Sequence, residues 1–480
     1  MNLFVLSFAT LASFVAIANG ASMIRQEAET GDSCNLTGTY QVGTDISSCS
    51  KITVGPLTVP AGVTLDLNRA KNGATINFVG VTTFGTKSWP GPLVTLSGNS
   101  LKVMGTGTLD GQGLWYWKQG TSIVRPVFFN VQSVIGSTIS GFTIKNSPYR
   151  TFSIFTSQHT TLSGLTLDST AGNGLAKNTD GFDMSLNEHV TITGNHIYNQ
   201  DDCLAMQSSI NTTFSGNTCS GGHGISIGSL GGKVVDETTT VSGLYAEGNI
   251  IINSDNGLRI KTVTDTGMDN GVVTNVKYIK NVLKNVRNAI AIHADYSRPL
   301  GAYNGIADSL VTISDVTVDG LTGSVGQKYD IVLNPRVVSK WTFSNIKLSA
   351  PEASLYVFVA SGVIEGQGSW DWKQGRSIIC PDFFCLHNVI SSTVSDITIK
   401  NMPFHTFSVV TCKDTTLTAL AIDARAGYGI AKNTAGFGLT MNDHVTIYKN
   451  TINNQDDCLA MQSSTNTIHL DYYDQQGCRQ

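Results

Sequence analysis

The side chains with the clearest capacity for chemistry are four polar residues in the middle of the chain. They are Asp180, the adjacent pair Asp201 and Asp202, and His223, and from Asp180 to Asp201 to His223 the separations are 21 and 22 residues. Three carboxylates and one imidazole that lie close together cannot all ionise independently, because mutual repulsion raises the pKa of at least one carboxyl group. Such a cluster supplies a proton donor beside an ionised base, the two roles that hydrolysis of a glycosidic bond requires.

Two basic residues follow, Arg259 and Lys261, in the segment NGLRIKTV. Residues two apart in a strand share a face, so Leu258 and Ile260 are expected to point inward. Arg and Lys on one face form a local cationic patch that suits an acidic ligand. Tyr296, in the segment IHADYS, is expected to add a stacking or hydrogen-bonding edge on the same side.

These residues meet only if the chain coils regularly, and short β-branched segments indicate that it does. Segments such as STISGFTIKN, TTLSGLTLDS and VTITGNHIYN recur, with glycines at intervals of 22 to 30 residues: Gly141, Gly164, Gly194, Gly216 and Gly243. Such a period is typical of a solenoid, here a parallel β-helix, whose bends often need φ > 0. A β-sandwich or propeller also has many short strands, but it needs hairpin turns of the Asn-Gly type between them.

In a β-helix, residues one coil apart lie side by side at about 4.8 Å. The spacing therefore predicts that Asp180, the Asp201–Asp202 pair and His223 occupy one face of three successive coils. Taken singly, each feature has a plainer interpretation. An Asp-Asp pair is typical of a solvated turn or a calcium ligand pair, a histidine between glycines is typical of a turn, and Arg or Lys is usually a surface charge. The joint spacing favours a functional site.

A larger repeat overlies the coils. The segment GTLDGQGLWYWKQG at 107–120 returns as GVIEGQGSWDWKQG at 362–375, and NQDDCLAMQSS at 199–209 returns unchanged at 454–464, both at an offset of 255 residues. The constant offset indicates a partial duplication. We expect residues 351–480 to form extra, truncated β-helix coils, either as an extension of the first solenoid, as a separate incomplete helix, or as the result of a fusion of tandem gene copies.

The second copy differs from the first at two acids. NTDGFD at 178–183 returns as NTAGFG, with Ala435 in place of Asp180 and Gly438 in place of Asp183. The copy keeps the Asp-Asp pair of QDDC but ends before any counterpart of the histidine or Arg-Ile-Lys motifs. We therefore predict that residues 351–480 have no activity of their own, and that residues 21–350 form the catalytic domain.

The bulk properties limit the setting in which the protein works. The 480-residue chain has a net charge of −4 and a pI near 6.1, so no global basic field is available for nucleic acid.

Residues 1–20 are apolar and end in Ala18-Asn19-Gly20, which predicts a secretory signal peptide. A membrane anchor is the alternative, but no basic stop-transfer segment follows. Nine cysteines and two N-glycosylation patterns, at Asn35 and Asn211, also fit a secreted, extracellular protein without a membrane segment after cleavage.

Four ordered motifs, NTDGFD, QDDC, SGGHGISIGS and RIK, resemble those of the polygalacturonases, a family of pectin hydrolases. The resemblance covers about residues 28–350. It implies a right-handed parallel β-helix that cleaves α-1,4-linked galacturonic acid with inversion. Endo action is expected from NTDGFD and from the lack of long insertions. The implied partner is pectin, bound by a monomeric protein that needs no metal and no cofactor.

The resemblance also assigns roles to residues. It implies that Asp201 is the general acid, that Asp180 and Asp202 hold and activate the attacking water, and that His223 tunes the ionisation of Asp201. The remaining roles concern the substrate: galacturonate carboxylates are expected to bind Arg259 and Lys261, and Tyr296 to contact the sugar. The family pattern further implies the disulfides Cys34–Cys49 and Cys203–Cys219. Two other pairings are suggested by spacing alone, Cys385–Cys412 and Cys458–Cys478.

Two alternatives remain open. Stacked coils place carboxylates about 5 Å apart, a separation that by the usual rule predicts retention and not the inversion that the resemblance implies. A pectate lyase on the same fold is a second enzyme class, and a pectin-binding protein without activity is a third function.

Overall fold

A computed structural model describes residues 33–120, 122–305, 307–334, 337–349, 362–366, 368–373, 382–387, 393–395, 397–470 and 473–474. The predicted signal peptide, residues 1–20, lies outside these ranges. No helix in the described part of the chain is long and apolar enough to cross a membrane.

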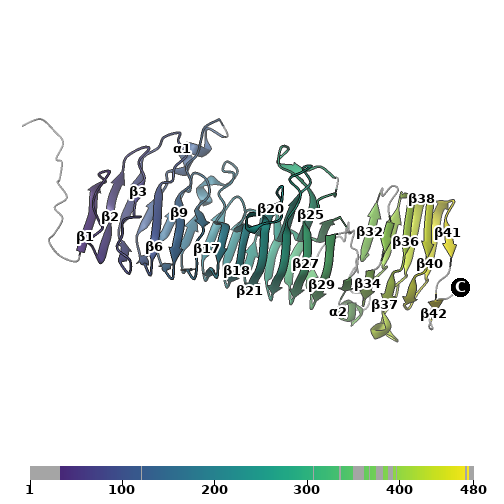
Figure 1. Ribbon diagram of the computed structural model, residues 1–480. Helices are drawn as coiled ribbons and strands as arrows, with labels where there is room; N and C mark the ends of the chain where they lie inside the picture. Colours follow the sequence, from purple (N-terminus) through teal and green to yellow (C-terminus); the bar gives the residue numbers. More distant parts are fainter. Residues whose placement is uncertain are drawn as a thin grey trace, which may run out of the picture.

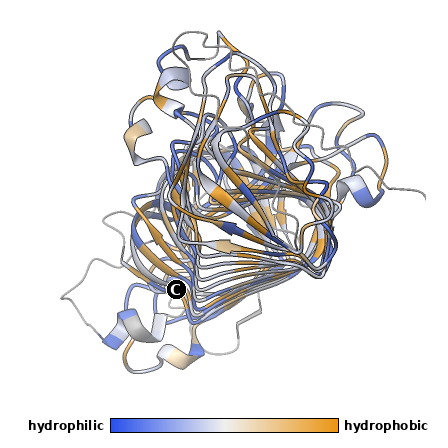
Figure 2. Cartoon of the chain, turned by 90° about the vertical axis from the view of Figure 1, so that its left-hand side faces the viewer, coloured by the Kyte–Doolittle hydropathy of each residue, from blue (hydrophilic) through white to orange (hydrophobic). Residues whose placement is uncertain are grey.

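The chain winds into successive coils, and each coil lays its strands beside those of the coil before it (Figure 1). Figure 2, viewed along the stack, shows the coils superimposed, with short helices at the periphery. Between described strands every pairing is parallel except that of β25 (Val282–Ser297) with β26 (Ala302–Tyr303). The all-β prediction of a parallel β-helix is therefore confirmed.

The strands of residues 33–349 form three faces, and several of the longer strands continue from one face to the next. The face whose strands follow the candidate residues Asp180, Asp201 and His223 is called the site face. It contains β3 (Leu65–Asp66), β6 (Val94–Asn99), β9 (Phe129–Ile135), β12 (Phe152–Phe155), β15 (Phe182–Glu188), β18 (Leu204–Ser215), β20 (Ile225–Leu230), β23 (Asn256–Val263), β25 and β28 (Thr322–Val332). The second face contains β1 (Ser33–Thr39), β2 (Lys51–Val59), β4 (Thr75–Phe78), β7 (Lys102–Gly105), β10 (Thr138–Ser140), β13 (Thr161–Ser163), β16 (Thr191–Thr193), β21 (Thr240–Glu247), β24 (Val272–Ile279), β27 (Thr312–Asp319) and β29 (Val338–Ser344). The third face contains β5 (Val81–Phe84), β8 (Thr108–Asp110), β11 (Thr143–Lys145), β14 (Thr166–Asp168), β17 (His196–Asn199), β19 (Thr218–Gly221), β22 (Ile250–Ile252) and β30 (Lys347–Ser349).

The core is made of columns of apolar side chains that repeat from coil to coil. Phe129, Phe152 and Phe182 occupy equivalent positions in β9, β12 and β15, and their rings stack with centroids 5.2 and 5.3 Å apart. Aligned inward residues of this kind bury apolar area in every coil, which is the main favourable term in folding. Leu258 and Ile260 are each 1% exposed, so they point inward as predicted.

The bends between faces depend on glycine and asparagine. The five periodic glycines at 141, 164, 194, 216 and 243 all have φ between 60° and 83°, as the spacing predicted. A ladder of buried asparagines fixes another bend, because the backbone N–H of Asn195, Asn217 and Asn249 each donates to the side-chain oxygen of the asparagine one coil on, at 2.9, 2.9 and 3.0 Å. The buried polar groups of these bends are thus satisfied within the stack.

Short helical elements lie outside the coils. They are α1 (Gly113–Trp117), η1 (Thr170–Gly172) and η2 (Glu237–Thr239) in the first copy, and α2 (Gly368–Lys373) and η5 (Arg425–Gly427) in the second. The segments of α1 and α2 correspond at the offset of 255 residues, yet the two helices project from opposite sides of the stack (Figure 1).

Residues 362–474 form further coils of the same kind. Their strands are β31 (Gly362–Glu365), β32 (Phe384–His387), β33 (Thr393–Ser395), β34 (Ile397–Lys400), β35 (Phe407–Val410), β36 (Lys413–Thr418), β37 (Ala421–Asp423), β38 (Phe437–Tyr448), β39 (Thr451–Asn453), β40 (Leu459–Thr465), β41 (Ile468–Leu470) and β42 (Tyr473–Asp474). β31 is the repeat of β8, a third-face strand, but it pairs with β29 of the second face. The second copy therefore stacks on the first with its faces turned about the axis.

Candidate active site

The candidate residues lie where the chain turns from the third face to the site face. Asp180 precedes β15, Asp201 and Asp202 precede β18, and His223 precedes β20. Since β15 pairs with β18 and β18 with β20, these turns belong to three successive coils. The chain folds this way locally because each turn is followed by an inward apolar residue that enters the core, such as Phe182 in β15.

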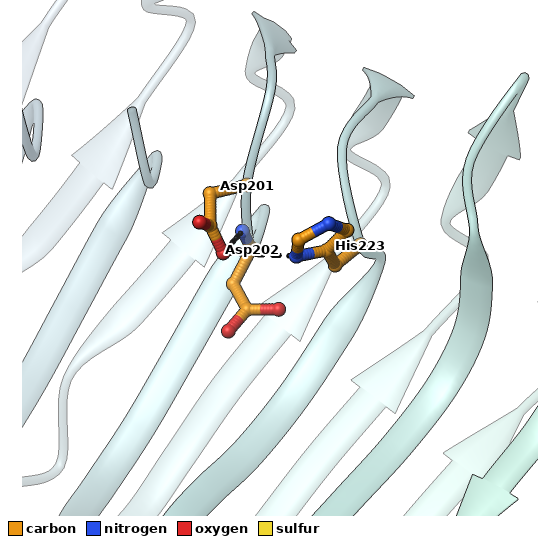
Figure 3. Close-up of side chains that lie close together, drawn as sticks. All are labelled: Asp201, Asp202 and His223. Atoms are coloured by element: carbon orange, nitrogen blue, oxygen red, sulfur yellow. Dashed lines mark hydrogen bonds and ion pairs between the residues drawn. The ribbon is translucent and has the colours of Figure 1, made fainter. Parts of the chain in front are cut away.

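Asp201 and His223 form a hydrogen-bonded pair across neighbouring coils (Figure 3). His223 Nδ1 lies 3.0 Å from Asp201 Oδ1, and His223 Nε2 lies 3.7 Å from Asp255 Oδ2. The other oxygen of Asp201 accepts a hydrogen bond of 3.3 Å from Asn178 Nδ2. Burial alone would raise the pKa of Asp201, but the hydrogen bond and charge of His223, together with nearby cations, lower that pKa to about 2.

Asp202 faces the two cations that the sequence places in β23. Its carboxylate accepts hydrogen bonds from Arg259, from Lys261 at 3.4 Å, and from the Ser226 hydroxyl at 2.5 Å. Arg259 Nε also donates to Ser226 Oγ at 2.9 Å, so one serine joins the acid and the guanidinium. Asp202 is 2% exposed, and this set of partners compensates a carboxylate that is removed from water.

Lys261 also approaches an aromatic ring. Its ammonium lies 5.5 Å from the centroid of the Tyr296 ring, and Tyr296 makes an edge contact with Tyr303 at 5.9 Å. The cation and the ring form one surface next to Asp202, a combination that binds the polar edge and the apolar face of a sugar.

Asp180 is the most strongly perturbed acid of the group. Burial raises its pKa well above the usual value, and the negative charges of Asp183, Asp201 and Asp202 raise it further. Asp180 and Asp201 are therefore shifted in opposite directions, one toward the protonated and one toward the ionised form. Two carboxyl groups with divergent pKa values are the electrostatic arrangement that acid–base catalysis uses.

A disulfide fixes the turn that carries the Asp-Asp pair. Cys203, the residue after Asp202, is bonded to Cys219 of β19, and a second disulfide joins Cys34 and Cys49. Both pairings implied by the resemblance are confirmed. The suggested Cys385–Cys412 disulfide is wrong, because Cys385 is a thiol whose pKa is raised by burial, and the Cys412 thiol donates to a backbone carbonyl at 3.2 Å. Cys458 is disulfide-bonded, and the residue suggested as its partner lies outside the described residues.

Comparison with known proteins identifies the family to which the chain belongs. Residues 49–355 and again 352–477 match Glycosyl hydrolases family 28. The chain belongs to this family. It is 40% identical over 359 residues to a probable endopolygalacturonase I of Aspergillus terreus, covering 73% of this chain and 95% of that protein. It is also 39% identical over 346 residues to a polygalacturonase of Saccharomyces cerevisiae, covering 70% and 93% of the two chains.

A solved structure supports the same assignment. The endo-xylogalacturonan hydrolase of Aspergillus tubingensis superposes with a TM-score of 0.57 and 25% sequence identity, covering 67% of this chain and 95% of that one. The resemblance stated from the motifs is thus confirmed, and the protein is a glycoside hydrolase. Both copies match family 28, so the partial duplication repeats part of a family 28 domain.

The family 28 site also contains residues that the sequence analysis did not single out. Asp183, from the quoted NTDGFD motif, is 6% exposed, and burial raises its pKa to about 7 against the opposing charge of Arg150. Arg150 Nε lies 3.4 Å from Asp183 Oδ1. Ser226, two residues after GGHG, donates to the candidate acid Asp202, and Asn178 donates to Asp201. The replacement of Asp183 by Gly438 in the second copy is the feature of the sequence that points to Asp183.

One group in the described part of the enzyme has the composition of a metal site. Single ligand atoms of Asp201, Asp202 and His223 all lie within 4.8 Å of one another. However, Asp202 already contacts Arg259 and Lys261, and Asp201 contacts His223. Two cations beside the carboxylates oppose the binding of a third positive charge, so these residues fit a metal ion poorly.

Proposed function

We propose that this family 28 enzyme is a secreted, endo-acting polygalacturonase that hydrolyses α-1,4 galacturonosyl linkages of pectin with inversion. One observation carries the proposal: acids with opposed pKa shifts on successive coils lie beside Asp202 and its two cations, the buried Arg259 and the partly exposed Lys261. The acids supply hydrolytic chemistry, and the cations supply recognition of a uronate. The names of the relatives, endopolygalacturonase among them, agree with this substrate.

In this mechanism Asp201 protonates the leaving glycosidic oxygen. In the free protein His223 and the nearby cations favour the ionised form of Asp201 and lower its pKa to about 2. A substrate carboxylate bound at Arg259 and Lys261 offsets those cations, and negative charge beside Asp201 raises its pKa, so that the carboxyl carries the proton that it donates to the leaving oxygen. His223 is thus a positioning residue that tunes the ionisation of Asp201.

Asp180 and Asp202 are proposed to hold and activate the attacking water: Asp202, which is paired with Arg259 and Lys261, accepts its proton, and Asp180, whose raised pKa favours the protonated form, holds the water by a hydrogen bond. Asp202 adjoins Asp201 in the chain, and Asp180 lies one coil earlier, so a water between them faces the same bond. Carboxylate oxygens of Asp201 and Asp202 lie within 4.8 Å, a separation closer to that of retaining enzymes than of inverting ones. We retain inversion, which NMR of the first product tests: α-configured new reducing ends that dominate at early times would contradict it.

The remaining roles concern the substrate. Arg259 and Lys261 are proposed to bind galacturonate carboxylates with the N–H groups not directed at Asp202, and Tyr296 to pack against the sugar. Electrostatic binding of this kind weakens with ionic strength. A substrate without carboxylates does not use these contacts, so polygalacturonate is preferred over neutral polysaccharides.

The deciding experiment measures release of reducing ends from polygalacturonate by the wild-type protein and by Asp201→Asn. We expect release by the wild type and a loss of at least about 10³-fold in the variant, since proton transfer to the leaving group is removed. A lyase would instead form unsaturated products that absorb in the ultraviolet, and a chelator would abolish its activity. A pectin-binding protein without activity would release no reducing ends in either form.

The setting and the domain organisation are also part of the proposal. Two disulfides fit an oxidising compartment, and with the predicted signal peptide at residues 1–20 they support secretion into the extracellular space. We propose that residues 21–350 act as a monomeric catalytic domain and that residues 351–480 are an inactive duplicate. Secretion with removal of the leader, and the elution volume of the mature protein in gel filtration, test these two points.

A further inference from the structure

A pair of arginines lies on the coils that precede Asp180, on the side opposite Arg259 and Lys261. Arg125 precedes β9 and Arg150 precedes β12, at the same turn that carries the acids in later coils. Tyr149 lies between their guanidinium groups, whose central carbons are 4.9 and 5.2 Å from the centroid of the ring. None of the proposed catalytic or substrate roles uses these residues.

Arg125 is held by three hydrogen bonds to the protein. It donates to the carbonyl oxygens of Pro148 at 3.3 Å and Lys177 at 2.5 Å, and to Asn178 Oδ1 at 3.1 Å. Asn178 in turn donates to Asp201. Arg125 therefore supports the turn that leads to the catalytic acids and holds Tyr149 against Arg150.

Arg150 has a different environment. Its side chain is 35% exposed, and its Nε faces Asp183 at 3.4 Å. The buried Nε and both carboxylate oxygens of Asp183 have no hydrogen-bond partner among the described residues. An ion pair that is held in place but not satisfied by hydrogen bonds leaves a cation with donors for an incoming anion.

The second copy shows that the coils form without these residues. At the offset of 255 residues it has Cys380 for Arg125, Phe404 for Tyr149, and His405 for Arg150, besides the loss of Asp180 and Asp183. The coils form nevertheless, since β32, β35 and β38 pair in the register of β9, β12 and β15. The cluster changes together with the catalytic acids and not with the fold, which indicates that it serves the reaction.

Electrostatic repulsion explains why a cation is needed on each side of the scissile bond. A polyuronate carries one carboxylate on every sugar, and along the coil axis it passes Asp180, Asp183, Asp201 and Asp202. Repulsion from these acids must be offset on both sides of the scissile bond if the chain is to lie across them. Arg259 and Lys261 provide this on the C-terminal side, and Arg150 is placed to provide it on the N-terminal side.

We propose that Arg150, held by Tyr149 and Asp183, binds a galacturonate carboxylate in a subsite on the N-terminal side of Asp180. This proposal rests on the proposed function, because it assumes a polyuronate substrate. The wild-type enzyme is therefore assayed first on polygalacturonate: absence of hydrolysis there contradicts the proposed function, whereas the tests below compare variants with an active wild type.

The test is a kinetic comparison of Arg150→Gln, Arg150→Lys and Arg150→His. The last variant introduces the residue that the equivalent coil of the second copy already accommodates, so it guards against misfolding. For Gln and His we expect KM for polygalacturonate to rise about tenfold or more with kcat within about threefold of wild type, and the Lys variant to recover most of the affinity. Arg425→Gln is the matched control, because Arg425 is paired with Asp423 in the second copy, outside the site.

A second readout separates a subsite from a structural role. Oligogalacturonates labelled at the reducing end are cleaved at preferred bonds, and the loss of a binding subsite moves that preference along the oligomer. We expect a shift for Arg150→Gln and Arg150→His but not for Arg425→Gln. The proposal is overturned if KM and the cleavage positions are unchanged, or if the variants lose only thermal stability or only kcat.

Discussion

The two copies of the repeat share their coils but not their chemistry. The phenylalanine stack of the first copy, with spacings of 5.2 and 5.3 Å, returns as Phe384, Phe407 and Phe437 with spacings of 4.6 and 5.2 Å. The turn before the Asp-Asp pair is also retained, since the backbone N–H of Gln200 and of Gln455 each donates to a threonine hydroxyl oxygen at 2.9 Å. Core and turn contacts are therefore specified independently of the acids.

What differs is the set of charged side chains around that turn. The second copy keeps Asp456 and Asp457, but it has Ala435 and Gly438 where the first copy has two buried acids. A buried carboxylate without cationic partners is costly, and Asp457 is accordingly exposed where Asp202 is buried. The comparison teaches that the coils need the apolar and turn residues, whereas the buried acids at positions 180 and 183 are dispensable for the fold.

The largest expected effect is obtained by transferring the change of the second copy into the first. Asp180→Ala reproduces the alanine of position 435 and removes an acid proposed to activate water. We expect hydrolysis of polygalacturonate to fall by about 10³-fold or more, while the coil folds normally because Ala435 is tolerated at the equivalent turn. Reducing-end release measures the activity, and circular dichroism measures the fold.

The matched control for this change is Asp456→Asn in the second copy, which we expect to leave activity within about twofold of wild type. Loss of activity in that variant would show that the second copy takes part in the reaction. Equal activity of Asp180→Ala and wild type would remove Asp180 from the mechanism.

A smaller effect is expected from the contact between His223 and Asp201. His223→Ala should lower kcat by about 10²-fold, because it removes the hydrogen bond that orients the Asp201 carboxyl. Since His223 lowers the pKa of Asp201, its loss should raise that pKa and move the basic limb of the pH–kcat profile to higher pH. His444→Ala is the control, since His444 Nδ1 also faces an aspartate, Asp443, at 2.7 Å but lies in the second copy. A profile that falls in height without moving would contradict the proposed effect of His223 on the ionisation of Asp201.

A still smaller effect is expected for substrate recognition. Lys261→Gln should raise KM for polygalacturonate about tenfold, equivalent to about 1.4 kcal/mol, and weaken the dependence of KM on salt. Lys449 offers a close control, because its ammonium lies 5.6 Å from the Tyr448 ring centroid, much as Lys261 lies 5.5 Å from Tyr296. We expect Lys449→Gln to change neither quantity, and a similar response of both variants would assign the effect to general charge.

Much of this comparison was predictable from the sequence. Glycine spacing and β-branched segments predicted the coils, since each coil repeats the same requirement for a positive φ at the bend. The intervals of 21 and 22 residues predicted that the acids and the histidine lie on neighbouring coils, because one coil converts sequence distance into lateral distance.

Other features depend on contacts between coils that the spacing of residues in the sequence does not determine. Arg150, at the turn before β12, meets Asp183 of β15 because both side chains point away from the core on adjacent coils, and sequence spacing alone does not distinguish this contact from solvent exposure. The turn of the second copy about the axis is set by the pairing of β31 with β29. The offset of 255 residues indicates which strands of the two copies are equivalent. It does not indicate how the second copy is rotated relative to the first.

The smallest expected effect concerns stability, and it comes from Asp183, for which the second copy has glycine. Burial raises the pKa of Asp183 to about 7, so between about pH 4 and pH 7 the folded protein holds a proton that the unfolded chain has released. Stability conferred by that proton is present at low pH and lost as the pH rises through 7. Asp183→Asn removes the proton uptake, so the decline of unfolding free energy with pH should become shallower by up to about 1 kcal/mol per pH unit. Urea unfolding at several pH values measures this slope, with Asp443→Asn as control, because the lowered pKa of that exposed acid acts only below the range. An unchanged slope in Asp183→Asn would mean that Arg150 keeps Asp183 ionised in the folded enzyme.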